Sequence, residues 1–281
     1  MPYTPTVRGR RVARELKRLR LKAGLTGEQA IAEIGWDTAK LSRMENAKMR
    51  ITSGEVMELL EVYGITGEQR TELVRLAREA RQKGWWHSYD DVLKSGFNDY
   101  LAFEAEALTY RTYQTTLIPG ILQTPDYARA VLSGSQPRTP EEIERGVEVR
   151  QARQKRITAS DQPLHVWAII DEAALHRLVD CPTVLKSQLE GLLDLGGLAN
   201  VSIQVLPYRA GIHAAIDGPF ILLTFDGYPE VLYMEHLMGC MYMEKPAETR
   251  RGNLILDHLL ASALNTGDSA RLIHQVAGAL S

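Results

Sequence analysis

The segment GWDTAKLSRMENAKMR (residues 35–50) concentrates side chains that can contact a polyanion. They include two hydroxyls, three of its four cations and one methyl group: Thr38, Ser42, Lys40, Arg43, Lys48 and Ala39. An arginine can form a two-pronged hydrogen bond with O6 and N7 of guanine, and a hydroxyl can donate to or accept from a base edge. Lysines neutralise phosphates as point charges, whereas an alanine offers only a methyl contact. The segment therefore carries the chemistry of a contact with nucleic acid.

Catalytic chemistry has weaker support. Glu172 and His176 are four residues apart in DEAALHR, a spacing that predicts a surface pair on one helix face, and Glu235 and His236 are adjacent and point to opposite sides of a strand. A metal or acid–base site needs three or more converging groups, and the sequence has no HExxH, glycine-rich phosphate loop or nucleophile elbow. We expect no catalytic residues, no metal and no cofactor. His213, in a loop of small residues, is kept as a candidate for ligand binding.

The elements that position the polar segment are five predicted helices within the first eighty residues. Val12, Leu16 and Leu19 recur on one helix face, which predicts a helix over residues 8–23, ended by Gly24. Capping boxes predict the starts of the second, fourth and fifth helices, from the pairs Thr26 and Gln29, Thr52 and Glu55, and Thr66 and Gln69.

The third helix is expected to begin after Asp37, an N-cap residue, and to turn Leu41 and Met44 inward. Gly35 supplies the turn before it. Two short helices joined by such a turn follow the helix-turn-helix plan, in which the second helix enters the major groove of DNA. The segment LTGEQAIAEIGWDTAKLSRMENAK resembles the helix-turn-helix of the Cro and phage-repressor class, also called the xenobiotic-response-element class, and the resemblance covers about residues 8–80.

This resemblance implies roles for individual residues, with a recognition helix over about residues 38–46. The positions at which the class reaches bases hold Thr38, Ala39, Ser42 and Arg43, and those nearer the phosphates hold Lys40 and Lys48. Arg20 and Glu45 correspond to an internal ion pair of the class, so Arg20 is given a structural role. The class often has Gln, a phosphate contact, where this chain has Gly27, and usually has Gly where this chain has Ala47.

The net charge of the chain changes sign just after the five predicted helices. Residues 1–83 contain 17 Lys and Arg against 11 Asp and Glu, whereas residues 84–281 contain 16 against 24. A basic first part attached to an acidic remainder suggests that only the first part meets a polyanion. We expect a DNA-binding domain over residues 1–83 and, over residues 84–281, a domain that binds an effector or partner and also forms the dimer. Trp85 and Trp86, which follow the boundary, are expected to pack in the structure rather than to stack on a ligand.

Composition limits the class of protein. The chain is 44% apolar and 24% charged, as in ordinary globular proteins, and its apolar runs are too short to span a bilayer. The N-terminus lacks the apolar segment of a secretory signal, so we expect a cytoplasmic, nucleoid-associated protein with no membrane partner. Cys181 and Cys240 have no CxxC spacing, which excludes a disulfide framework and a thiolate zinc site, and are expected to be buried.

Residues 84–281 combine helical and strand-like patterns. Helices are expected over 97–113, 124–132, 141–157, 172–195, 247–264 and 269–280, and strands over 163–170, 200–207, 218–225, 230–236 and, at an edge, 239–245. A short connection at 226–229 favours a hairpin. The helix over 141–157 is expected to be exposed, with its basic end (Arg150, Arg153, Lys155 and Arg156) complementing the helix dipole. The predicted fold is α+β: an all-α five-helix domain, then a larger α+β domain with a small, mainly antiparallel sheet.

The second part also resembles a known family. The blocks YLAFEAEALTYRTYQTTLIPGILQTPDYARAVL, IIDEAALHR, VSIQVLPY and VLYMEHLMGCMYMEK are similar to the C-terminal domain of unknown function attached to a helix-turn-helix in many actinobacterial regulators, including WhiJ-like proteins. The similarity spans about residues 96–265. It implies an antitoxin-like transcriptional regulator paired with a small protein from a neighbouring gene.

These observations favour one function and leave two others open. The favoured one is a non-enzymatic regulator that binds double-stranded DNA as a homodimer, because one helix-turn-helix contacts too few bases, and whose second domain senses a small protein or metabolite. The second makes that domain an enzyme targeted by DNA binding, which requires polar side chains converging in a deep pocket. The third is an interaction adaptor with a vestigial DNA helix, supported by Gly27 and Ala47. The operator, the direction of regulation and the effector are not predicted.

Overall fold

The structure is a computed structural model that describes residues 6–80, 84–93, 96–135, 137–178, 180–236 and 239–280. The chain divides into two compact units, Met1–His87 and Ser88–Ser281. The boundary therefore lies four residues beyond the expected one. None of the described helices is long and apolar enough to cross a membrane.

The first unit contains the five expected helices: α1 (Val7–Lys22), α2 (Gly27–Ile31), α3 (Thr38–Glu45), α4 (Ser53–Val62) and α5 (Gly67–Glu79). The capping boxes at Thr26 and Thr52 are both formed. The one expected at Thr66 is wrong, since this side chain makes no capping hydrogen bond. The next residue, Gly67, has a φ of 66°, so the chain does not enter α5 by the extended-to-helical step that a capping box requires.

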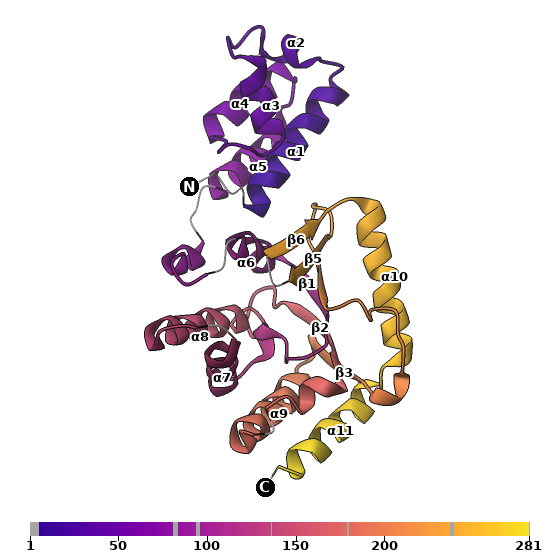
Figure 1. The fold of residues 1–281 in the computed structure, drawn as a ribbon. Helices are drawn as coiled ribbons and strands as arrows, with labels where there is room; N and C mark the ends of the chain where they lie inside the picture. Colours follow the sequence, from indigo (N-terminus) through magenta and orange to yellow (C-terminus); the bar gives the residue numbers. More distant parts are fainter. Residues whose placement is uncertain are drawn as a thin grey trace. The chain divides into compact units, whose positions relative to one another are not determined.

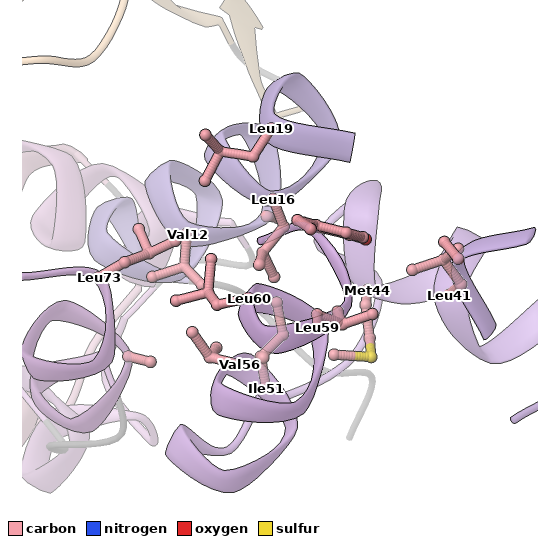
Figure 2. Packing of buried hydrophobic residues seen from close by; sticks show 14 of the residues in the cluster. Val12, Leu16, Leu19, Leu41, Met44, Ile51, Val56, Leu59, Leu60 and Leu73 are labelled. Atoms are coloured by element: carbon pink, nitrogen blue, oxygen red, sulfur yellow. The ribbon is translucent and has the colours of Figure 1, made fainter. Parts of the chain in front are cut away.

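One apolar cluster holds these helices together (Figure 2). Leu16 of α1, Met44 of α3, and Leu59 and Leu60 of α4 are fully buried in it, and Leu41 is 2% exposed. Burying an aliphatic side chain of this size contributes about 1.5–3 kcal/mol. Because Leu41 and Met44 are fixed inward, the opposite face of α3 is fixed outward.

The second unit is built on one six-stranded sheet. Its strands are β1 (Thr109–Gln114), β2 (His165–Asp171), β3 (Val201–Leu206), β4 (Phe220–Thr224), β5 (Val231–His236) and β6 (Gly239–Met243). Their order is β3-β2-β1-β4-β5-β6. The first three strands pair in parallel and the last three continue antiparallel, with the expected hairpin between β4 and β5 and β6 at the edge. The prediction of a small, mainly antiparallel sheet was wrong, because the sheet is larger and mixed.

The parallel half was missed because β1 was taken for the end of a helix. The helix α6 (Phe97–Glu106) ends before Ala107, which is extended, and β1 lies between β2 and β4 at the centre of the sheet. Its tyrosines, Tyr110 and Tyr113, are buried on opposite faces of that sheet. This central position is set by partners far away in the sequence, and the local pattern does not reveal it.

Helices cover both faces of this sheet. They are α7 (Pro125–Ser135), α8 (Pro140–Gln154), α9 (Pro182–Gly196), α10 (Pro246–Ser262) and α11 (Thr266–Gly278), with short 3-10 turns η1 (Trp85–Tyr89), η2 (Gly120–Leu122), η3 (Glu172–Leu175) and η4 (Tyr208–Ala210). In Figure 1, α7 and α8 lie on one side of the sheet and α10 on the other. Leu256 and Leu259 of α10 pack against Tyr113 on that second face.

The expected single helix over residues 172–195 is instead the turn η3 followed by α9. Proline lacks the N–H that a helix interior needs, so Pro182 starts a new helix rather than continuing one. The two cysteines also differ from expectation: Cys181 is exposed, at the N-cap of α9, and Cys240 is half-buried on the edge strand β6. Helix ends and sheet edges lie at the surface, which explains both.

Candidate nucleic-acid interface

The outer face of α3 presents a continuous polar surface. The Asp37 side chain caps the helix by accepting a hydrogen bond from the Lys40 amide at 2.5 Å. The exposed residues on this face are Thr38, Ala39, Ser42 and Arg43, which are the four placed at base-contacting positions by resemblance. Their spacing keeps them on one side, away from the buried Leu41 and Met44. The arrangement can present a guanidinium, two hydroxyls and a methyl group to the edges of bases.

Asn46 extends this face and is not among the residues that the sequence predicts to contact bases. It is exposed at the C-cap of α3, and its amide nitrogen donates to the Ser42 carbonyl oxygen at 2.7 Å. Asparagine can pair with adenine through two hydrogen bonds. Its position four residues after Ser42 was the signal that would have included it.

The turn after α3 depends on an alanine in a left-handed conformation. Ala47 has a φ of 52°, its amide donates to the Met44 carbonyl at 3.0 Å, and the Lys48 amide donates to the Arg43 carbonyl at 2.8 Å. These two bonds form the Schellman ending that usually contains glycine. The departure at Ala47 therefore does not change the path of the chain, and Lys48 stays exposed just beyond the helix.

Lys40 is placed differently from the other basic residues. Its ammonium lies 2.9 Å from Glu55 and 3.7 Å from the ring centroid of Trp36, and its side chain is 27% exposed. Burial acts to raise the pKa of the Glu55 carboxyl, but hydrogen bonds from Thr52 and Lys40 outweigh it and lower this pKa. Lys40 is thus paired within the unit, and a phosphate would have to compete with Glu55 for it.

Arg20 and Glu45 connect α1 to the end of α3. The Arg20 Nε and Nη2 atoms donate to the two Glu45 carboxylate oxygens at 2.6 and 2.9 Å, and Nη1 donates to the Leu25 carbonyl at 2.8 Å. The side chains are only 11% and 6% exposed. The hydrogen bonds to Glu45 raise the pKa of Arg20. The hydrogen bonds of this guanidinium are therefore made within the first unit, where they connect α1 to α3.

Gly27 begins α2 with free space around it. A Cβ atom at this position would meet only Leu41 Cδ2, at 3.8 Å, which is ordinary van der Waals contact. Packing therefore does not require a glycine here. Because this chain has Gly27 where the class that it resembles often has Gln, it lacks a side chain that could reach a phosphate.

Glu172 and His176, two of the residues considered for catalysis, both contact Tyr208, whereas Glu235 and His236 line a pocket of the second unit. Glu172 lies in η3, where its carboxylate accepts from the Tyr208 amide at 2.7 Å, and His176 stacks on the Tyr208 ring at 6.4 Å between centroids. The expected helical pair of Glu172 and His176 is wrong because the helix ends at Leu175. Within the described residues, no three His, Cys, Asp or Glu side chains could hold a metal ion.

His213 contacts the face of the sheet covered by α10. Its Nε2 lies 3.1 Å from the Tyr113 hydroxyl, which donates to Asp171 Oδ2 at 3.2 Å, and its Nδ1 accepts from the Ala215 amide at 3.3 Å. Burial, aided by the Asp171 charge, raises the pKa of Tyr113. These contacts hold the loop against the sheet, and His213 does not line the pocket of this unit that is described below.

Comparison with known proteins agrees with this division. A family model described as a helix-turn-helix domain matches residues 11–73, so the first unit indicates a DNA-binding regulator. A second model, described as a domain of unknown function (DUF5753), matches residues 97–275. This match covers more than half of the chain, and the chain therefore belongs to the DUF5753 family. No curated protein and no solved structure is significantly similar to it.

Proposed function

We propose that this protein is a sequence-specific transcriptional regulator of the xenobiotic-response-element type, which reads the major groove of DNA with α3. The observation that carries the proposal is the outward face of α3, where Thr38, Ser42 and Arg43 are exposed while Leu41 and Met44 are held in the core. A capped helix with polar residues at its N-terminal half is the geometry of major-groove recognition.

The test is a binding titration on the full chain. Fluorescence anisotropy compares duplexes from the gene's own upstream region with shuffled duplexes of the same composition. Wild-type protein is expected to prefer the upstream duplex, and Arg43→Ala is expected to lose roughly 1–3 kcal/mol of that discrimination while folding normally, because the side chain is exposed.

The matched control is Arg70→Ala, which removes an exposed arginine from α5 instead of α3. It is expected to retain the preference. Equal discrimination by wild type and Arg43→Ala, or equal loss in both variants, would reject α3 as the reading element.

The second unit is proposed to act by binding rather than by catalysis. We infer that it receives a small molecule or a small protein encoded by a neighbouring gene, as in antitoxin-like regulators of actinobacteria, and that the protein works as a cytoplasmic homodimer on a two-fold site. One helix-turn-helix contacts few base pairs, and two related half-sites supply the missing specificity. A strict monomer in sedimentation, both free and on the DNA site, would reject the dimer.

A further inference from the structure

The second unit contains a pocket of about 530 Å³ between α8 and the sheet face opposite to α10. Every residue that lines it belongs to this unit. The size lies within the range of small-molecule sites. On α8, the lining residues Gly146, Val149, Arg150 and Arg153 follow the spacing of a single helix face. The sequence predicts an exposed basic helix here, and the structure shows instead that two of its arginines point into the pocket.

Arg153 is neutralised by the protein itself. Its Nε and Nη2 atoms donate to the Glu104 carboxylate oxygens, both at 2.7 Å, and Nη2 lies 3.1 Å from the Tyr100 hydroxyl, which donates to the same carboxylate. Arg153 is 6% exposed and Glu104 is 2% exposed. A buried pair with both partners hydrogen-bonded forms part of the wall, and its charge is not available to a ligand.

Arg150 has only neutral hydrogen-bond partners among the described residues. Its Nη1 atom donates to the Gln123 side-chain oxygen and, at 3.2 Å, to the Ala128 carbonyl, and both acceptors are uncharged. Across the described ranges of the chain, no carboxylate lies within ion-pair distance of its guanidinium. Burial, together with the charges of Arg153 and Arg138, lowers the pKa of Arg150 to about 10, although the charge of the Glu235 carboxylate acts in the opposite direction. A largely buried cation with neutral partners favours an anion as its missing neighbour.

The walls around this cation are aromatic. Phe97, Tyr100, Tyr110 and Tyr233 line the pocket, with ring centroids 5.1 Å apart for Phe97 and Tyr100 and 4.4 Å apart for Tyr100 and Tyr233. Aromatic faces stabilise planar or apolar groups by burying their area. Two carboxylates also line the pocket, Glu142 and Glu235. Glu235 is exposed at the end of β5, where it accepts a hydrogen bond from the Tyr233 hydroxyl at 3.5 Å.

We propose that this pocket binds a small organic anion, with a carboxylate paired to Arg150 and an aromatic or aliphatic body against Phe97, Tyr100 and Tyr233. The regulatory meaning of this site rests on the proposed function, since the ligand would be the signal received by the second unit. The binding itself is independent of DNA and is measured without it.

The experiment is calorimetric titration of the full-length protein with two pairs of probes: 1-naphthoate against 1-naphthamide, and decanoate against decanamide. Each pair has the same body and differs in charge. We expect both carboxylates to bind with one site per chain and at least about tenfold more tightly than their amides, as charge-assisted hydrogen bonds to a desolvated guanidinium require. Amides that bind as tightly as the acids, or no binding by either acid up to about 5 mM, would overturn the proposal.

Variants of Arg150 test whether its charge is the one that binds the carboxylate. Arg150→Gln is expected to weaken carboxylate binding at least about tenfold and to leave amide binding unchanged, which also shows that the pocket is still folded. Arg150→Lys is expected to be intermediate, because it keeps the charge and loses the planar fork. The control, Arg251→Gln, removes an exposed arginine from α10, on the other side of the sheet, and should bind like wild type. Wild-type carboxylate affinity in Arg150→Gln would contradict the assignment.

Two failures are separable. If the wild-type protein discriminates its DNA site but binds neither carboxylate, the anion-binding proposal is rejected and the proposed function is not. Carboxylate binding by a protein that shows no DNA preference rejects the proposed function alone.

Discussion

At the level of single residues, Ala47 has a strained backbone conformation within the candidate interface. An L-residue in the left-handed region is strained by contact between its Cβ and the backbone, and glycine is not. Ala47→Gly is therefore expected to stabilise the first unit by about 0.5–1 kcal/mol, after allowing for the greater freedom of glycine in the unfolded chain. Urea unfolding of the wild type and this variant measures the difference. A lower free energy of unfolding in the variant would show that the strain is not there.

Arg150 allows a second stability prediction. Its pKa of about 10 lies below the ordinary value for arginine, so the folded state holds this proton less tightly than the unfolded chain does. The charged form therefore costs stability at every pH below about 10, and the cost is relieved as pH rises from there toward the ordinary value. We expect Arg150→Met to raise the free energy of unfolding of the unliganded protein at pH 7 by about 1 kcal/mol, less than the full shift implies because two hydrogen bonds are lost.

This prediction separates a ligand-binding arginine from a structural one. Residues that serve binding often reduce the stability of the free protein, whereas a structural arginine would stabilise it. Thermal unfolding of Arg150→Met without ligand gives the sign. A loss of more than about 1 kcal/mol would assign Arg150 to the support of the fold.

At the level of elements, a substitution at the start of the short helix α2 tests the proposed contact of the first unit with DNA. The space around Gly27 admits a side chain, and a glutamine at the first position of this helix would stand where the Cro class contacts a phosphate. Gly27→Gln is expected to tighten binding to specific and shuffled duplexes alike, by several-fold, because phosphate contacts carry no sequence information. Gly27→Ala is the control for the helix propensity alone. A gain confined to the specific duplex, or an equal gain in the control, would contradict a phosphate contact.

The elements also show what could be predicted from the sequence. The five helices of the first unit follow from local signals, such as the Asp37 cap and the apolar spacing of Leu41 and Met44, and these signals also placed the exposed face of α3. The sheet depends on pairing between distant segments. The segment that forms β1 follows α6 without a turn residue, so its identity is decided by β2 and β4, which no local pattern announces.

The pocket was missed for the same physical reason. Arg150 and Arg153 looked like the basic end of an exposed helix, but their partners Gln123 and Glu104 lie 27 and 49 residues away in the chain. A charged side chain is expected at the surface unless a partner is known. The local sign of burial was that both arginines share a helix face with Gly146 and Val149. A solvent-exposed helix face has no need of such uncharged residues beside its charged ones.

At the scale of the whole molecule, the charges of the two parts have opposite sign, and each part has its own chemistry. The basic first part is suited to a polyanion, whereas the acidic second part as a whole repels one, so the anion proposed for its pocket depends on the local charge of Arg150. A regulator of this kind requires that ligand in one unit and DNA at the other be linked through a free energy of coupling. Adding 1-naphthoate during a DNA titration is expected to shift the DNA affinity, and Arg150→Gln is expected to remove that shift.

We propose that the exposed face of α3 reads bases, and a base-by-base scan is the sharpest test of this proposal. Selection from random duplexes defines the preferred site, and each base pair of one half-site is then replaced in turn and titrated with wild type and Arg43→Ala. We expect the variant to become indifferent to replacement at one G·C pair, where wild type loses about 1–3 kcal/mol, and to discriminate still at the other positions. An affinity that falls by the same factor at every position, or that does not change at any, would contradict it.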